Sequence, residues 1–239
     1  ATRVQVELAY IANQPTVSSS GIDTYGQPTA GLVNWNTVLL HPEQADQAQL
    51  RCRARLRLPA GWSWAGTLSG ADAAGMVAFA PVTLEALVDQ PVLLGARIAR
   101  HRLRTGGDFT ASVASAGPGA FDAAWLAPLG RLPDQALLLF GGAWMPRYEL
   151  LVFFADQRFG LEHATCSVAG IPAAMGSFAH SDRRARTVLP HELVHAWVGK
   201  QRRPAGMRTG DLQRTPVHDG LWVYEGLTHY LGQVLSVRC

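Results

Sequence analysis

Two short segments in the C-terminal half constrain this chain most. Residues 191–195 read His-Glu-Leu-Val-His, and Glu225 follows 30 positions after His195, within the sequence Trp-Val-Tyr-Glu-Gly. On a helix, side chains at positions i and i+4 project from the same face, so both imidazoles could reach a single zinc ion. Glu192 lies between them and is placed to act on a metal-bound water rather than to bind the metal. The pattern predicts one zinc ion held by His191, His195 and Glu225.

The sequence around the two histidines predicts a buried helix. Pro190 precedes His191, where we expect it in the first turn of the helix. Residues 193–198 are almost all apolar, as in a helix that threads the middle of a domain. Buried polar side chains need partners, and a metal ion would supply one. The alternative is that both histidines are ordinary core residues and that Glu192 pairs with an arginine, such as Arg183 or Arg186.

Glu225 lies in a second apolar segment. The expected helix is largely buried and contains Leu221, Trp222, Leu227, Tyr230, Leu231 and Val234. A carboxylate in such a helix would need a cation, although an ordinary surface glutamate remains the alternative. His229 shares the helical face of Glu225 and is a candidate for orienting a metal ligand through a hydrogen bond. Tyr224 and Tyr230 are expected to be packing aromatics.

The chain divides by pattern into two modules, an N-terminal all-β domain (1–117) and a domain with helices (118–239), so we expect an α+β fold. Residues 3–109 show strand-like alternation, for example at Val4, Val6, Leu8 and Tyr10, and residues 97–103 are expected to continue the N-terminal sheet. The alternation of arginine with less polar residues over 51–58 predicts a half-buried strand. Further expected segments are a linker at 115–119, helices at 133–141 and 147–156, and a strand at 160–168.

Composition narrows the class of protein. The net charge is only +3, almost all basic residues are arginine, and Lys200 is the only lysine. The arginine-rich strand has no interleaved stacking aromatics, so nucleic acid is not an expected partner. No apolar run is long enough to cross a membrane, and a membrane is not an expected partner either. Three widely spaced cysteines give no disulfide framework, and the compartment stays open between periplasmic or secreted and cytoplasmic.

Several stretches resemble the glycyl aminopeptidases, zinc metallopeptidases of the gluzincin group that usually carry a PDZ domain. In the C-terminal half the stretches are Gly-Leu-Glu-His at 160–163, Leu-Pro-His-Glu-Leu-Val-His-Ala-Trp at 189–197, Lys200 with Arg-Arg-Pro at 202–204, and Leu-Trp-Val-Tyr-Glu-Gly-Leu-Thr at 221–228. Near the start, Asn-Trp-Asn-Thr at 34–37 and Leu-Pro-Ala-Gly-Trp at 58–62 are similar to the N-terminal domain of that family. The gap between His195 and Glu225 is longer than in better-known aminopeptidases of the clan, and the extra length at 201–220 is expected to be a surface loop.

The resemblance implies an N-terminal β domain followed by part of a thermolysin-like zinc peptidase domain. It implies that Glu192 is the general base and that Glu162 binds the free α-amino group of a peptide substrate. The expected reaction is hydrolysis of the N-terminal peptide bond, with Gly or Ala first, a preference that comes from the family. Two alternatives stay open: a thermolysin-type endopeptidase, and an inactive zinc-binding module whose β domain is a docking surface.

The resemblance also implies parts that this sequence does not show. Related enzymes place a tyrosine that stabilises the oxyanion well downstream of the distal glutamate, which would fall beyond Cys239. A C-terminal helical domain and the PDZ domain would follow. We therefore expect a truncated chain whose cleft is completed by a missing C-terminal portion or a partner chain, with weak or no peptidase activity by itself.

Overall fold

The structure is a computed structural model that describes residues 4–9, 25–43, 45–156, 158–210, 212 and 214–239. Residues 4–9 run without strand pairing to the described part of the chain, and their apolar side chains are exposed. The alternation expected to form a strand there is therefore not part of a described sheet, and Tyr10 lies outside the described residues.

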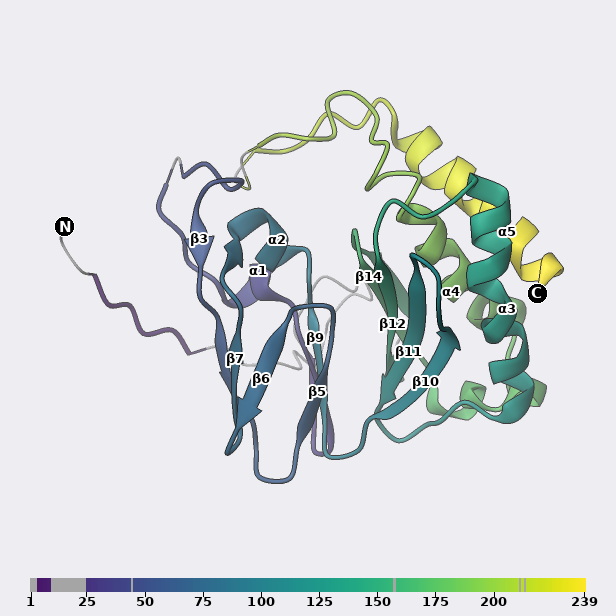
Figure 1. The fold of residues 1–239 in the computed structure, drawn as a ribbon, viewed down its shortest axis with the longest axis horizontal. Coiled ribbons are helices and arrows are strands. Elements are labelled where there is room, and N and C mark those ends of the chain that lie inside the picture. The colour runs from purple at the N-terminus through teal and green to yellow at the C-terminus, as the bar shows by residue number, and fades with distance from the viewer. Residues whose placement is uncertain (1–3, 10–24, 44, 157, 211, 213) are drawn as a thin grey trace.

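The N-terminal β module consists of three small antiparallel sheets (Figure 1). The four-stranded sheet has the order β1 (Tyr25–Gln27), β2 (Ala30–Val33), β9 (Val92–Gly95) and β5 (Ser63–Ala65). The others are β4 (Arg55–Arg57), β7 (Met76–Phe79) and β6 (Gly70–Ala73), and the pair β3 (Arg51–Cys52) and β8 (Val82–Thr83). Two short helices, α1 (Trp35–Val38) and α2 (Leu84–Val88), complete it. Over 51–58 the arginines are exposed and the residues between them are partly or fully buried, which confirms the predicted alternation.

A five-stranded mixed sheet forms the centre of the molecule. Its order is β10 (Ala99–Arg104), β11 (Thr110–Ala116), β12 (Arg147–Phe154), β14 (Cys166–Ile171) and β13 (Phe159–Glu162). The three inner strands run parallel, and the two edge strands pair with them in the antiparallel sense. Strand β13 therefore lies at an edge of the sheet, with Glu162 at its end.

Both faces of this central sheet are covered. Alternate residues of β12 point to opposite sides, so Leu150 and Val152 pack under the C-terminal helices while Leu151 and Phe153 pack against the four-stranded sheet. The expectation of a helix at 147–156 is wrong for this reason. A parallel strand buried on both faces reads as a continuous apolar run, which periodicity cannot distinguish from a buried helix.

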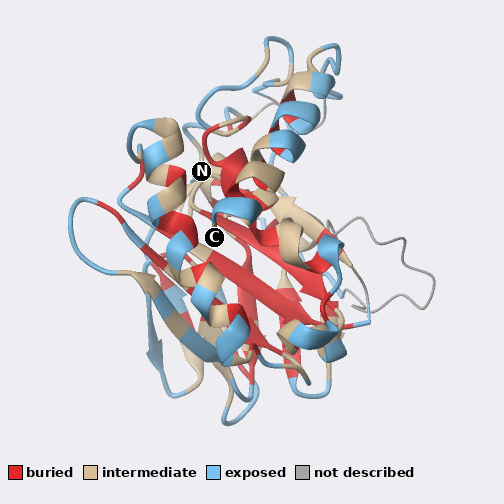
Figure 2. Cartoon of the chain, turned by 90° about the vertical axis from the view of Figure 1, so that its right-hand side faces the viewer, coloured by how far each residue is buried: buried red, intermediate tan, exposed pale blue. Residues whose placement is uncertain are grey.

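The helices of the C-terminal module cover the face of the central sheet that is turned away from the β module. Figure 2 shows these helices, with their exposed outer sides, above the buried strands. Helix α3 (Ala123–Phe140) connects β11 to β12, and two 3-10 turns, η1 (Ala173–Gly176) and η2 (Phe178–His180), lead to α4 (Arg183–His195). The π-helical segment η3 (Trp222–Leu227) continues directly into α5 (Thr228–Arg238). Helix α3 begins ten residues before the expected helix at 133–141, because Asp122 caps its N-terminus with a bond from the Trp125 amide at 3.0 Å.

Three other sequence expectations need correction. Strand β10 belongs to the central sheet and not to the N-terminal one, because it pairs with β11. The expected linker at 115–119 begins inside β11, and only the part after Ala116 lies outside the strand. The expected single strand at 160–168 is an antiparallel hairpin made of β13 and β14.

The α+β class is as expected, with an N-terminal β module and a C-terminal module that contains the helices. The boundary between residues 117 and 118 stays a prediction, although the central sheet takes in β10 and β11, which precede it. No helix in the described ranges is long and apolar enough to cross a membrane.

Candidate metal centre and active site

Helix α4 brings the two histidines together. Asp182 caps its N-terminus by accepting a hydrogen bond from the Ala185 amide at 2.8 Å, so the helix starts well before Pro190. The expectation of Pro190 in the first turn is therefore wrong; the proline lies within the helix and is buried. The Nε2 atoms of His191 and His195 are 3.2 Å apart.

Glu225 reaches the same point from the π-helical segment η3. Its Oε2 lies 3.5 Å from His191 Nε2 and 3.6 Å from His195 Nε2. The imidazoles of His191 and His195 beside it lower the pKa of Glu225 to about 2. The structure thus brings together the three residues that the spacing predicted as ligands.

The three atoms fit a zinc ion by their separations. Zn–N and Zn–O bonds of about 2.0–2.1 Å at tetrahedral angles place neighbouring ligand atoms roughly 3.3–3.4 Å apart. The observed separations of 3.2, 3.5 and 3.6 Å span that value. Two imidazoles with one carboxylate are also the donor set of a catalytic zinc site with an open fourth position.

A hydrogen bond fixes the second ring nitrogen of His195, Nδ1. Its Nδ1 lies 3.1 Å from the carbonyl oxygen of Val198, and because a carbonyl only accepts, the ring proton belongs on Nδ1. The lone pair of Nε2 is then directed towards Glu225 and His191, as a metal ligand requires. The hydroxyl of Thr228, fully buried, lies 3.4 Å from the same Nδ1 and donates to the carbonyl oxygen of Tyr224 at 2.6 Å.

Glu192 is buried against the edge strand. Within the described part of the chain it has no ion pair, and its Oε2 has no hydrogen-bond partner, so pairing with Arg183 or Arg186 does not occur. Burial, with the negative charges of Glu162 and Glu225, raises the pKa of Glu192 well above its ordinary value. A buried carboxylate oxygen without a partner is costly, and a water bound at the adjacent ligand set would supply that partner.

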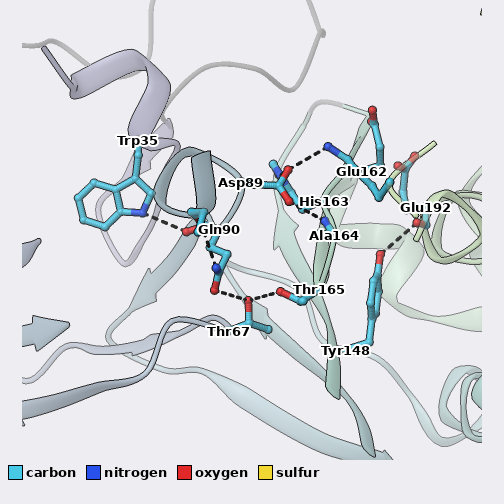
Figure 3. Close-up of polar contacts among 12 residues, drawn as sticks. Trp35, Thr67, Asp89, Gln90, Tyr148, Glu162, His163, Ala164, Thr165 and Glu192 are labelled. Carbon is cyan, nitrogen blue, oxygen red and sulfur yellow. Dashed lines mark hydrogen bonds and ion pairs between the residues drawn. The ribbon is translucent and has the colours of Figure 1, made fainter. Parts of the chain in front are cut away.

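Room for Glu192 depends on Gly160 in β13. A Cβ atom at position 160 would lie 1.9 Å from Glu192 Oε1, a separation that real structures do not allow. The backbone carbonyl of Glu192 accepts a hydrogen bond from the buried hydroxyl of Tyr148 at 3.0 Å, as Figure 3 shows. The glutamate is thus fixed between the helix and the strand.

Glu162, two residues beyond Gly160, completes a group of acidic side chains. One oxygen each from Glu162 and Glu192 and a nitrogen of His195 lie within 4.8 Å of one another. The Tyr224 hydroxyl donates a hydrogen bond to Glu162 Oε1. Burial alone would raise the pKa of Glu162, but the charges of Lys200 and His195 and the bond from Tyr224 outweigh it, so the pKa is lowered.

His229 is in a less direct position than its spacing indicated. Its ring centroid is 6.1 Å from that of His191, and no hydrogen bond joins it to a ligand atom within the described residues. It lines a cavity of about 280 Å³ together with Gly160, His191 and Glu192. A role in orienting a ligand stays a prediction.

The apolar segment around Glu225 is more exposed than expected. Trp222 is 76% exposed and Tyr230 is 64% exposed, so the expectation of a largely buried helix is wrong. Tyr224, in contrast, is buried, and its ring lies 4.8 Å from that of His195. The π-helical winding of 222–227 places both Tyr224 and Glu225 at the site.

Two residues at the site were missed by sequence reasoning. Tyr224 was expected only to pack, and its place next to Glu225 was the available signal. Asp89, at the end of α2, accepts hydrogen bonds from the Ala164 amide at 2.7 Å and from Lys200 Nζ at 2.9 Å. Nothing in the local sequence marks it, because its partners lie 75 and 111 positions away.

Glu162 lines a second, larger cavity between the two modules. It measures about 850 Å³ and is lined by Glu162, His163 and Lys200 on one side and by Glu85 and Asp89 on the other, among others. His191 and Glu192 line the first cavity, and Glu162, whose carboxylate lies close to that of Glu192, lines the second. Two histidines and a glutamate beside a buried carboxylate are the side-chain arrangement of zinc metallopeptidases.

Comparison with known families agrees with that class. A profile of the M61 glycyl aminopeptidases matches residues 184–239, and one of the M61 peptidase N-terminal domain matches residues 1–96. These two matches together cover more than half of the sequence. The chain belongs to the M61 glycyl aminopeptidase family. No curated protein matches it.

Solved structures share its fold. An aminopeptidase N family protein from Idiomarina loihiensis matches with a TM-score of 0.76 at 23% identity, over 89% of this chain and 38% of that one. An M1 zinc metallopeptidase from Deinococcus radiodurans bound to a Tyr-Ser-Ala substrate matches with a TM-score of 0.55 at 16% identity, over 93% of this chain and 49% of that one. This chain therefore spans less than half the length of both.

Proposed function

We propose that this chain carries the zinc site and the amine-binding carboxylate of an aminopeptidase that removes an N-terminal Gly or Ala from peptides. The observation that carries the proposal is the position of Glu162, whose carboxylate lies within 4.8 Å of His195 and Glu192. The preference for Gly or Ala is supported by the name of the family and not by a pocket residue.

Each residue has a part that its surroundings support. His191, His195 and Glu225 would hold the zinc ion. When bound, zinc would lower the pKa of its water to about 7, and its charge would offset the carboxylates around Glu192. Glu192 would accept the proton of that water and deliver it to the departing amine.

Glu162 would determine where the chain is cut. A carboxylate fixed beside the metal can bind the α-ammonium group of a peptide, which places the first peptide carbonyl at the reaction centre. The bond from Tyr224 orients one of its oxygens. Peptides with a free N-terminus would then be cleaved one residue from the end.

A pair of substrates tests this proposal. Zinc-loaded protein is given glycine p-nitroanilide and its N-acetylated form, and release of p-nitroaniline is followed. We expect slow but measurable cleavage of the free amine, no cleavage of the acetylated form, and no activity for Glu192→Gln with its zinc retained. Equal cleavage of both substrates would point to an endopeptidase, and stoichiometric zinc without either activity would point to an inactive zinc-binding module.

A further inference from the structure

Glu162 has a competitor for the substrate amine inside the protein. Lys200 lies in the same cavity between the modules, and its positive charge is the strongest of the influences that lower the pKa of Glu162. A lysine ammonium and a peptide α-ammonium have nearly the same chemistry as ion-pair partners of a carboxylate. If Lys200 paired with Glu162, the carboxylate would be occupied.

Asp89 engages Lys200 instead. The Asp89 Oδ1 atom lies 2.9 Å from Lys200 Nζ, and the side chain of Lys200 is only 13% exposed. The same oxygen is 3.3 Å from Nδ1 of the buried His163, and Oδ2 accepts the Ala164 amide at 2.7 Å. Both oxygens of the carboxylate are used, so Asp89 holds a fixed orientation.

The contact between Asp89 and Lys200 lies next to the end of β13, where Glu162 is. His163 and Ala164 directly follow Glu162 at the end of β13, and Figure 3 shows Asp89 beside both of them. Asp89 itself comes from the N-terminal β module, at the C-terminal end of α2. The β module thus contributes a charge to the site of the other module.

We propose that Asp89 is a positioning residue that binds Lys200 and so keeps Glu162 free for the α-amino group of the substrate. The inference rests on the proposed amine-binding role of Glu162. It gives the contact between the two modules a specific part in substrate recognition. A purely structural contact would have a different signature, because removing Lys200 could not repair the loss of Asp89.

The test measures peptide binding rather than turnover. All variants carry Glu192→Gln and are loaded with zinc, and calorimetry gives the dissociation constants of glycine p-nitroanilide and of its N-acetylated form. Asp89→Asn keeps the shape of the side chain and an acceptor for the Ala164 amide, but removes the charge that binds Lys200. We expect its dissociation constant for the free amine to rise about tenfold or more, as for a lost charge-assisted hydrogen bond.

The decisive variant is the double substitution Asp89→Asn with Lys200→Met. Methionine keeps most of the apolar length of lysine without its charge. We expect the double variant to bind the free amine within about threefold of the parent, as a near-neutral net change would give. Weak binding by the double variant, equal to that of Asp89→Asn alone, would overturn the proposal.

Two further variants keep the test interpretable. Lys200→Met alone should retain binding of the free amine, and it decides the question if Asp89→Asn does not fold; loss of binding there would also overturn the proposal. Asp134→Asn is the matched control, because it also removes the acidic partner of a cation, Arg104, but neither residue lines this cavity, and it should leave binding unchanged.

The result separates this inference from the proposed function. If the parent binds the free and acetylated compounds equally, Glu162 does not bind the amine and the proposed function fails, and with it this inference. If the parent discriminates but Asp89→Asn discriminates equally well, only the role of Asp89 is wrong.

Discussion

At the scale of single residues, the site depends on the close approach of the Glu192 side chain to the backbone of Gly160. Gly160 leaves room for Glu192 Oε1, since a Cβ atom there would lie 1.9 Å away. We predict that Gly160→Ala lowers kcat about 100-fold, as for a catalytic group displaced by an ångström, and lowers stability by about 1–3 kcal/mol from overpacking.

Turnover of glycine p-nitroanilide and denaturant unfolding measure both effects. Gly130→Ala is the control, because the added methyl meets open space within helix α3 and should stabilise by about 0.5–1 kcal/mol. A Gly160→Ala protein as active and stable as the parent would contradict this account of Glu192.

The metal ligands that the sequence predicted correctly lie in short segments whose residue spacing is characteristic of a zinc site. His191 and His195 share one helix, and Glu225 follows in a recognisable segment, so their meeting could be predicted. The hydrogen-bond partner of Tyr224, Glu162, lies 62 positions away in strand β13, which no local pattern reveals. The ligand geometry followed from the helical period, whereas the contacts that orient the carboxylates needed the fold.

At the scale of elements, the junction of η3 and α5 contacts the ring nitrogen of His195 that does not face the other metal ligands. Thr228, at this junction, donates to the Tyr224 carbonyl at 2.6 Å and lies 3.4 Å from His195 Nδ1. We predict that Thr228→Val weakens zinc binding about tenfold, the lower end of the effect of losing an outer partner of a ligand. Chelator competition measures the zinc affinity.

Ser236 offers a control in the same helix. Its hydroxyl bonds the carbonyl of Gly232 at 2.8 Å, four residues back, as Thr228 bonds that of Tyr224, but it does not contact a ligand. Ser236→Ala should leave zinc affinity unchanged. An equal loss in the two variants would mean that the effect comes from the helix and not from His195.

The prediction of helices and strands failed where a segment is buried on both sides in the folded protein, so that its sequence shows no clear period. Strand β12 is apolar on both faces because it lies between two layers, so its sequence also suited a helix. The exposed arginine pattern over 51–58 was predicted well because one face of that region meets water. Periodicity is informative at half-buried elements and ambiguous in the centre of the sheet.

At the scale of the whole molecule, Asp89 joins the two modules through Lys200, His163 and Ala164. Burial alone would raise the pKa of Asp89, but the hydrogen bond from His163 and the charge of Lys200 outweigh it and hold the pKa well below its ordinary value. A carboxyl with a lowered pKa binds fewer protons folded than unfolded. Its contribution is therefore present above about pH 4 and lost as the pH falls further.

We predict that the free energy of unfolding, measured by denaturant at pH 6 to 3, declines less steeply below pH 4 for Asp89→Asn than for the parent. At pH 6 the variant should be less stable by about 1–3 kcal/mol, from loss of a partly buried charged contact. Asp134→Asn, at the exposed ion pair with Arg104, should change stability by less than about 1 kcal/mol. Parallel pH curves for Asp89→Asn and the parent would contradict this role.

The central claim is that His191, His195 and Glu225 converge on one zinc ion, and zinc content after dialysis against excess zinc and then metal-free buffer tests it most directly. The account predicts one zinc per chain for the parent, and near-complete loss for His195→Ala and for Glu225→Ala. A parent without zinc, or variants that retain it as the parent does, would contradict the claim.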